Sequence, residues 1–203
     1  MLFDILGAVT SLLSTYFFIR VNNKAWLFGL LAISMNSYLY WKKGIYADMC
    51  LEFFYFVSLS YGWYRWTKQS SQPTVAIRSA TGNEWCWLVV ITTLLYFSIY
   101  YILTTFTHST IAKLDACTTA LSIMGQVLIC HKILATWVFW FLADVCYTYL
   151  YLAKDLPYHG LLMVIYTGMA VAGFFHWYAI SLNRESMTWL RLQAFRNNNN
   201  FIQ

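Results

Sequence analysis

An acidic residue in the middle of an apolar segment is the feature of this sequence best suited to binding chemistry. Asp144 lies near the centre of the apolar run 135–152. It belongs to a stripe whose spacing of three and four residues marks one helical face: Trp137, Trp140, Asp144, Tyr147 and Tyr151. A carboxyl group at that depth of a membrane costs at least about 2.5–3.5 kcal/mol, so it faces the protein interior and indicates a substrate pathway.

A second acid, Glu52, lies one helical turn before Tyr55 in the run 45–66. All thirteen Lys and Arg residues lie near the ends of the apolar runs or in the gaps between them. Asp144 and Glu52 are therefore protonated, hydrogen-bonded to neutral partners, or available to a cationic ligand. The alternative for either acid is a structural one, a hydrogen bond that clamps two helices together.

Aromatic faces next to a carboxylate suit a flat cationic ring, which stacks on Trp or Tyr with about 2 kcal/mol or more of attraction when desolvated. The side chains that we expect to bind such a ring are Asn36, Glu52, Tyr55, Trp137, Trp140, Asp144, Tyr147 and Tyr166. Trp26, Trp66 and Trp177 lie near the ends of their runs, where we expect interfacial belts. We find no catalytic or metal-ligand spacing and no Walker motif, so we expect no enzyme, no metal and no cofactor.

The elements that position these residues are membrane helices. The chain is 60% hydrophobic and only 10% charged, against about 25% charged in soluble domains. Seven runs are long enough to span a bilayer: 3–19, 25–41, 45–66, 84–106, 114–130, 135–152 and 158–181. The linker 67–83 and the tail 182–203 are polar, and the Asn run 197–200 predicts a disordered end.

The cations predict the orientation of the chain. They lie in short gaps rather than on one face, so we expect no nucleic-acid partner. In a seven-span chain, one side of the membrane holds the N-terminus and the gaps between spans 2 and 3, 4 and 5, and 6 and 7. That side carries Lys42, Lys43, Lys113 and Lys154, and the other side carries the remaining nine Lys and Arg. The positive-inside rule therefore predicts a periplasmic N-terminus and a cytoplasmic C-terminus.

The sequence also matches itself at an offset of 111 residues. Positions 26–66 share twelve identities with 137–177, among them Trp26 with Trp137, Gly62 with Gly173 and Tyr55 with Tyr166. We therefore expect an all-α membrane protein with one three-helix repeat at 1–66, a loop and linker helix (84–106) within 67–113, and a second repeat at 114–181. One linker helix makes the repeats parallel, a transporter arrangement with the substrate between them.

Two stretches then resemble a known family. WLFGLLAISMNSYLYWKKGIYADMCLEFFYFVSLSYGWYRW (26–66) and WVFWFLADVCYTYLYLAKDLPYHGLLMVIYTGMAVAGFFHW (137–177) are similar to the Pnu-type vitamin transporters. The resemblance implies a full-length SWEET-like fold in the bacterial inner membrane. It also implies facilitated diffusion of a vitamin precursor, trapping by a cytoplasmic kinase that phosphorylates it, and a trimer as a possible assembly.

The substrate is less sharply indicated than the family. Nicotinamide riboside is the commonest assignment for the family, and its pyridinium ring fits a site of aromatics and carboxylates. Glu52 stands where the family pattern often has Gln, and this second acid also suits thiamine. A membrane receptor that does not transport is the remaining alternative.

Overall fold

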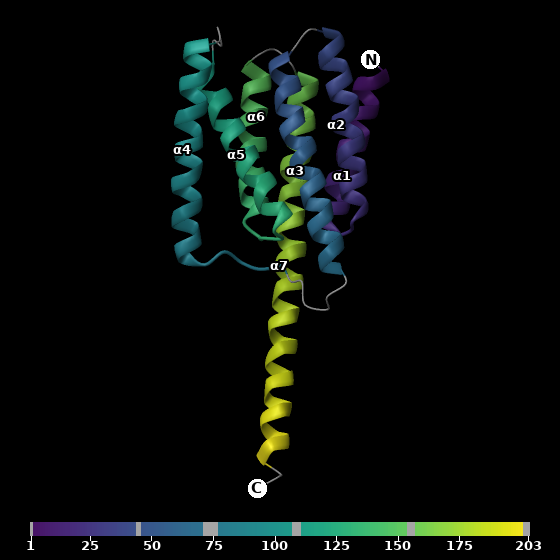
Figure 1. Cartoon of the computed structure of the whole chain (residues 1–203), viewed down its shortest axis with the longest axis vertical. Coiled ribbons are helices and arrows are strands. Elements are labelled where there is room, and N and C mark those ends of the chain that lie inside the picture. The colour runs from purple at the N-terminus through teal and green to yellow at the C-terminus, as the bar shows by residue number, and fades with distance from the viewer. Residues whose placement is uncertain (1, 44–45, 71–76, 107–110, 154–156, 201–203) are drawn as a thin grey trace.

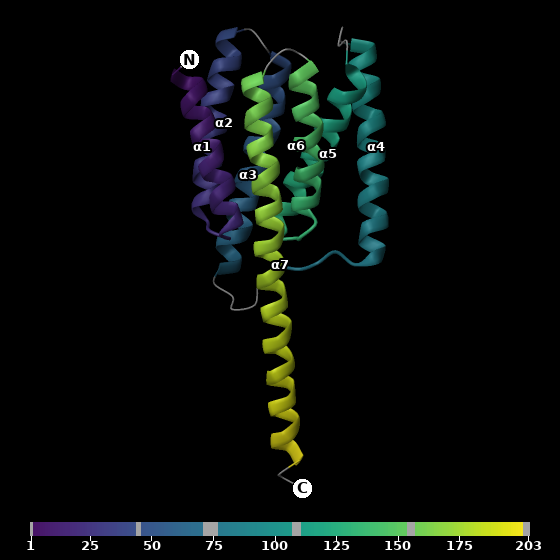
Figure 2. The same cartoon turned by 180° about the vertical axis from the view of Figure 1, so that it is seen from behind.

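The computed structural model is an all-helical bundle (Figures 1 and 2). It describes residues 2–43, 46–70, 77–106, 111–153 and 157–200, with side chains over 5–38, 52–68, 77–106, 111–152 and 158–183. The predicted helices agree with the observed ones to within a few residues at most ends. They are α1 (Leu2–Ile19), α2 (Lys24–Lys43), α3 (Tyr46–Ser70), α4 (Gly82–Phe106), α5 (Ala112–Cys130), α6 (Thr136–Ala153) and α7 (Pro157–Asn200).

The tail is the clearest difference from the predicted helix bounds. We expected disorder in the Asn run, but α7 continues to Asn200 and leaves the bundle as a single helix (Figure 1). Its 44 residues measure about 66 Å at 1.5 Å per residue, about twice the thickness of a bilayer core. No Gly or Pro follows Gly173, so nothing in the sequence breaks the helix after the apolar part.

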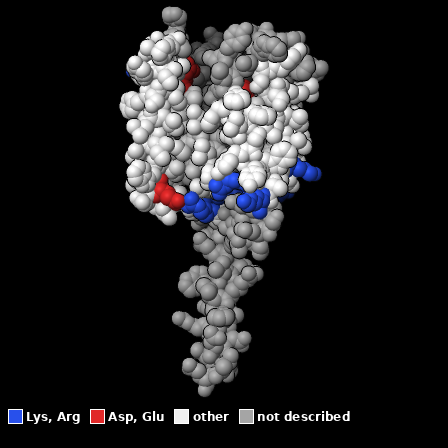
Figure 3. All heavy atoms as spheres, viewed as in Figure 1, with Lys and Arg blue, Asp and Glu red and all other residues white. Residues whose placement is uncertain are grey.

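Three of the described helices are long and apolar enough to cross a membrane, namely Gly82–Phe106, Ala112–Cys130 and Tyr158–Asn183. A shorter apolar helix covers Ile5–Ile19. The length and composition of these helices suit a membrane, and the count of seven spans stays a prediction. Lys and Arg side chains gather in a band at the end of the bundle where α7 leaves it (Figure 3). We call this the basic end.

Two turns at the basic end have the same unusual backbone. Val21, between α1 and α2, has a φ of 53°, and Lys132, between α5 and α6, has a φ of 54°. The backbone N–H groups of both residues donate to the carbonyl three residues earlier, Phe18 or Ile129. The two turns lie 111 residues apart, at the offset at which the sequence matches itself.

The start of α4 is fixed by a capping box. The Glu84 carboxylate accepts a hydrogen bond from the Thr81 backbone N–H at 2.9 Å, and the Thr81 hydroxyl accepts one from the Glu84 N–H at 3.3 Å. Arg78 forms an ion pair with the same carboxylate at 2.8 Å. Among the described residues, α4 packs mainly on α5, and its Trp85 stacks on Phe139 of α6 with ring centroids 6.3 Å apart. None of the described α4 residues is buried.

Candidate functional site

The two halves of the bundle meet through reciprocal contacts at the basic end. The indole N–H of Trp66 on α3 donates to the carbonyl of Ile129 on α5 at 3.2 Å. The indole N–H of Trp177 on α7 donates to the carbonyl of Phe18 on α1 at 3.0 Å. Donors and acceptors are each 111 residues apart, so each third helix is tied to the first helix of the other half.

Four indoles form what we call the tryptophan layer: Trp26, Trp66, Trp137 and Trp177. Trp26 meets Trp66 edge-to-face with centroids 5.2 Å apart, and Trp137 meets Trp177 in the same way at 5.4 Å. Trp66 and Trp177 are 6.2 Å apart across the middle. The layer fills the space between the halves at the basic end.

This arrangement corrects the expectation of an interfacial belt. Trp26, Trp66 and Trp177 are fully buried, with no exposed surface. Trp26 and Trp66 lie near helix ends, as predicted, and Trp177 lies near the end of the apolar part of α7, but all three point inward. Backbone carbonyls of the opposite half accept hydrogen bonds from Trp66 and Trp177, whereas the Trp26 indole nitrogen has no partner among the described residues. Trp137, which we expected at the binding site, also belongs to this layer and is 2% exposed.

A lysine covers the tryptophan layer from the basic end. The Lys132 ammonium lies 4.6 Å from the centre of the Trp66 ring, a cation–π distance, although the residue is only 6% exposed. Burial lowers the pKa of this lysine, since desolvation disfavours its charged form. The basic end is therefore closed by aromatic rings, with a cation on the outer side of the layer.

A polar region lies deeper in the bundle, on the side of the tryptophan layer that faces away from the basic end. Asp144 on α6 is two helical turns, about 10 Å, from Trp137 and is 7% exposed. Its carboxylate forms no ion pair and no hydrogen bond with the side chains that the structure describes. Thr148 donates to the backbone carbonyl of Asp144 at 2.8 Å, not to its carboxylate. The clamp alternative for Asp144 therefore has no partner among these side chains.

Tyrosines from both halves surround this region, again in reciprocal positions. The Tyr55 hydroxyl on α3 lies close to Ser122 on α5, and the Tyr166 hydroxyl on α7 lies close to Ser11 on α1. Tyr147 on α6 also approaches Ser122. The Ser122 oxygen nevertheless has no hydrogen bond of good geometry. These contacts bring three of the predicted binding residues to the boundary between the halves.

The remaining predicted residues separate into two places. The Trp140 indole packs on Gly125 of α5, where an added Cβ would come within 3.1 Å of its ring. Asn36 on α2 donates to the Glu52 carboxylate on α3 at 3.4 Å. Glu52 thus has a partner within its own half, unlike Asp144. Asp48, at the start of α3, lies outside the described side chains.

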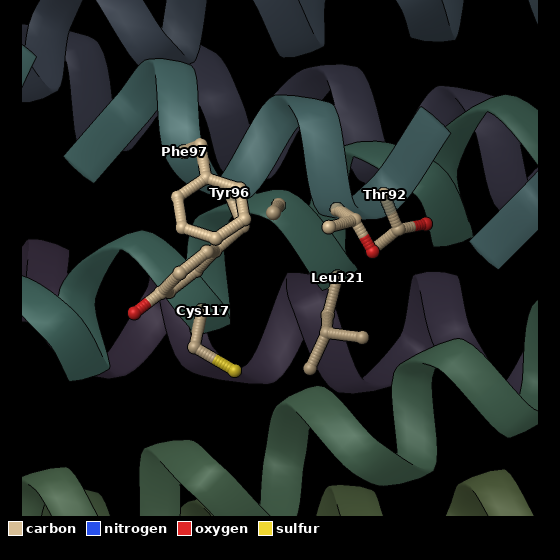
Figure 4. Close-up of a pocket in the computed structure, with 7 residues that line it drawn as sticks. Thr92, Tyr96, Phe97, Cys117 and Leu121 are labelled. Atoms are coloured by element: carbon tan, nitrogen blue, oxygen red, sulfur yellow. The ribbon is translucent and has the colours of Figure 1, made fainter. Parts of the chain in front are cut away.

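A groove between α4 and α5 is distinct from this region (Figure 4). Its volume is about 320 Å³, and its lining contains no charged side chain. The Thr92 and Thr93 hydroxyls donate to carbonyls of their own helix, at 2.7 and 2.8 Å. The groove offers nothing that would neutralise a cationic ligand.

Comparison with known proteins decides the family. Residues 1–179 match the model of the nicotinamide mononucleotide transporter family. The chain belongs to this family. The nicotinamide riboside transporter PnuC of Escherichia coli K12 is 21% identical over 187 residues, which cover 79% of this chain and 78% of that protein. PnuC of Neisseria mucosa is 25% identical over 185 residues, covering 84% and 70%.

The fold of the family also matches a solved structure. A crystal structure described as the vitamin B3 transporter PnuC has a TM-score of 0.71, at 21% identity, over 88% of this chain and 81% of that one. The chain is therefore a helical membrane protein of a transporter family, not of a family of enzymes. No group of three His, Cys, Asp or Glu side chains gathers within the described residues.

Sequence reasoning missed the polar side chains that α5 contributes. Ser122 and Gln126 lie one helical turn apart and are 1% and 5% exposed. The Ser122 oxygen and the Gln126 side-chain nitrogen are both buried, and neither has a hydrogen-bond partner in the part of the chain that the structure describes. The pairing of Ser11 with Ser122 at the 111-residue offset was the signal available in the sequence.

Proposed function

We propose that this protein carries nicotinamide riboside into the cell by facilitated diffusion across the bacterial inner membrane. The observation that carries the proposal is the buried Asp144 carboxylate, which has no cationic partner among the described side chains and lies among aromatic rings at the boundary between the halves. A buried charge without a partner is costly, and a pyridinium ring neutralises it. Relatives named as nicotinamide riboside transporters support the same substrate.

Each predicted residue has a proposed role in that site. Asp144 balances the ring charge, and Trp140, Tyr55, Tyr147 and Tyr166 supply the aromatic faces. Asn36 and Glu52 meet the ribose hydroxyls, for which a carboxylate and an amide are suitable partners. Trp137 acts from the tryptophan layer, as the floor of the site.

We propose further that two parallel three-helix repeats, residues 1–66 and 114–181, move against each other around this site, with α4 as the linker in a seven-span SWEET-like fold. The reciprocal Trp66 and Trp177 hydrogen bonds support this relation, since they join equivalent atoms of the two halves. The tryptophan layer is then the closed cytoplasmic gate. Alternating access requires that it opens when the periplasmic side closes.

The cellular setting follows from the same proposal. The basic end faces the cytoplasm, so the N-terminus is periplasmic and the C-terminus cytoplasmic. A carrier without an energy source only equilibrates its substrate, so a cytoplasmic kinase that phosphorylates the riboside traps it inside. Helix α4 is apolar and none of its described residues is buried, so it faces lipid or, in a trimer, neighbouring copies.

Thiamine is the second candidate, and Glu52 is the observation that favours it. Glu52 adds a second acid to the region and suits the aminopyrimidine ring of thiamine. Titration calorimetry of the purified protein with each vitamin separates the two. Tight binding of the riboside alone supports the proposal, tight binding of thiamine alone moves the protein to the second candidate, and binding of neither contradicts both.

A further inference from the structure

The unpartnered polar atoms of α5 indicate what the ligand must carry besides its charge. Gln126 is 5% exposed, and its side-chain nitrogen has no hydrogen-bond partner among the described residues. Buried amide groups in proteins are nearly always satisfied, because leaving a donor unpaired costs the full desolvation of that group. A buried N–H donor without an acceptor is explained when the acceptor arrives with the ligand.

The neighbours of Gln126 place it at the proposed site. Gly125 contacts the Trp140 indole, and Ser122, one turn earlier on the same face of α5, lies beside Tyr55 and Tyr147. Asp144 follows Trp140 by one turn of α6. Gln126 thus shares a helix face with Ser122, beside the tyrosines at the boundary between the two halves, and its backbone adjoins the contact between Gly125 and the Trp140 ring.

The equivalent position of the other half has no unpartnered donor. The position equivalent to Gln126 at the 111-residue offset is Thr15 on α1, whose hydroxyl donates to the Ser11 carbonyl at 3.2 Å. The position equivalent to Trp140 is Gly29. The donor, the stacking ring and Asp144 therefore all belong to the second half, which makes the site one-sided.

We propose that Gln126 is a specificity-determining residue that donates its side-chain N–H to a carbonyl on the ring of the ligand, with Ser122 as a second donor nearby. The ligand class is then a pyridinium nucleoside whose ring bears a carboxamide, rather than any flat cation. This inference rests on the function proposed above and adds the chemical group that the site recognises. Asp144 recognises the charge of the ligand, and the polar side chains of α5 recognise the substituent on its ring.

The test compares two ligands by titration calorimetry: nicotinamide riboside, and N-ribosylpyridinium, which lacks the carboxamide. Wild-type protein binds the riboside at least about tenfold more tightly, because a site built to hydrogen-bond a group rejects the analogue without it. Gln126→Leu lowers riboside affinity about tenfold and leaves ribosylpyridinium affinity within about twofold. Thr15→Val, the matched change in the other half, alters neither affinity.

Each other outcome overturns the inference. Equal affinity of wild-type protein for the two ligands excludes recognition of the carboxamide, and this comparison stands even where Gln126→Leu does not fold. A Gln126→Leu protein that keeps the wild-type preference shows that another residue reads the group. Binding of neither ligand by wild-type protein contradicts the proposed function as well, whereas the first two outcomes leave it intact.

Discussion

Asp144 is the residue on which charge recognition depends. Asp144→Asn keeps the shape of the side chain and removes the charge that balances a pyridinium ring. We expect riboside affinity to fall at least about tenfold, since a hydrogen bond or contact to a charged partner is worth about 1.5–3 kcal/mol. Titration calorimetry measures the loss.

The stability of the same variant separates binding from structure. A buried carboxylate without a described partner destabilises the fold, so Asp144→Asn should melt at the wild-type temperature or above it. Wild-type affinity together with a lower melting temperature would contradict the account and return Asp144 to a structural role.

Residue types and spacing predicted part of the site. Asp144, Tyr55, Trp140, Tyr147 and Tyr166 could be singled out because helical periodicity identifies a shared face. Gln126 could not, because a polar residue in a helix is informative only once every neighbour is known and none accepts its hydrogen. Position along an apolar run gives the depth of a residue but not whether its side chain points to lipid or to the bundle interior, which is why the buried Trp66 was expected at the lipid interface.

At the scale of the helices, alanine substitutions at two glycines of α7 test the packing of the tryptophan layer. A Cβ at Gly173 would come within 2.6 Å of the Trp137 ring, whereas a Cβ at Gly168 would meet nothing within 4 Å. Gly173→Ala should destabilise the protein by about 1–3 kcal/mol through overpacking. Gly168→Ala, its control on the same helix, should be neutral or stabilise it by up to about 1 kcal/mol.

Thermal unfolding in detergent with a fixed lipid content compares the two variants. If the melting temperatures of Gly173→Ala and Gly168→Ala are the same, the close approach of α6 and α7 at Trp137 is not part of the folded protein. The same pair of helices then could not carry the gate proposed above.

The contacts between halves predict how the gate opens. Trp66→Phe and Trp177→Phe keep an aromatic face and remove the N–H that reaches the opposite half. Each substitution destabilises the closed conformation by about 1 kcal/mol, so the population of the open conformation should rise about fivefold. Cys130 reports this, because it is 2% exposed in the same core cluster as the four indoles and donates to the Ser58 carbonyl at 3.4 Å.

Alkylation of Cys130, kept as the sole cysteine, should therefore accelerate about fivefold in each variant. Trp87→Phe is the control, since Trp87 is 60% exposed on α4. Unchanged alkylation in both gate variants would show that these hydrogen bonds do not hold the basic end closed.

The helices themselves were largely predictable, because long apolar runs separated by short polar gaps fix where each helix begins and ends. The tail was not, because its asparagines indicate disorder by composition while the structure continues α7 to Asn200. The reciprocal contacts between α3 and α5 and between α1 and α7 required the structure, since a sequence repeat does not say which faces meet.

For the whole molecule, the distribution of charge predicts the orientation in the membrane. The cations form a band at the end of the bundle where α7 leaves it (Figure 3), and the positive-inside rule places that end in the cytoplasm. A C-terminal green fluorescent protein fusion should fluoresce, and a C-terminal alkaline phosphatase fusion should be inactive. An active phosphatase would reverse the orientation and move the tryptophan layer to the periplasmic side.

Transport itself can be measured as the flux of nicotinamide riboside into proteoliposomes that contain the purified protein. Without a gradient of ions or an energy source, we expect labelled riboside to enter until its concentrations inside and outside are equal. With a riboside kinase and ATP enclosed, label should accumulate beyond that level as the phosphorylated product. Entry no faster than into protein-free liposomes would contradict transport, and accumulation of unmodified riboside without kinase would contradict facilitated diffusion.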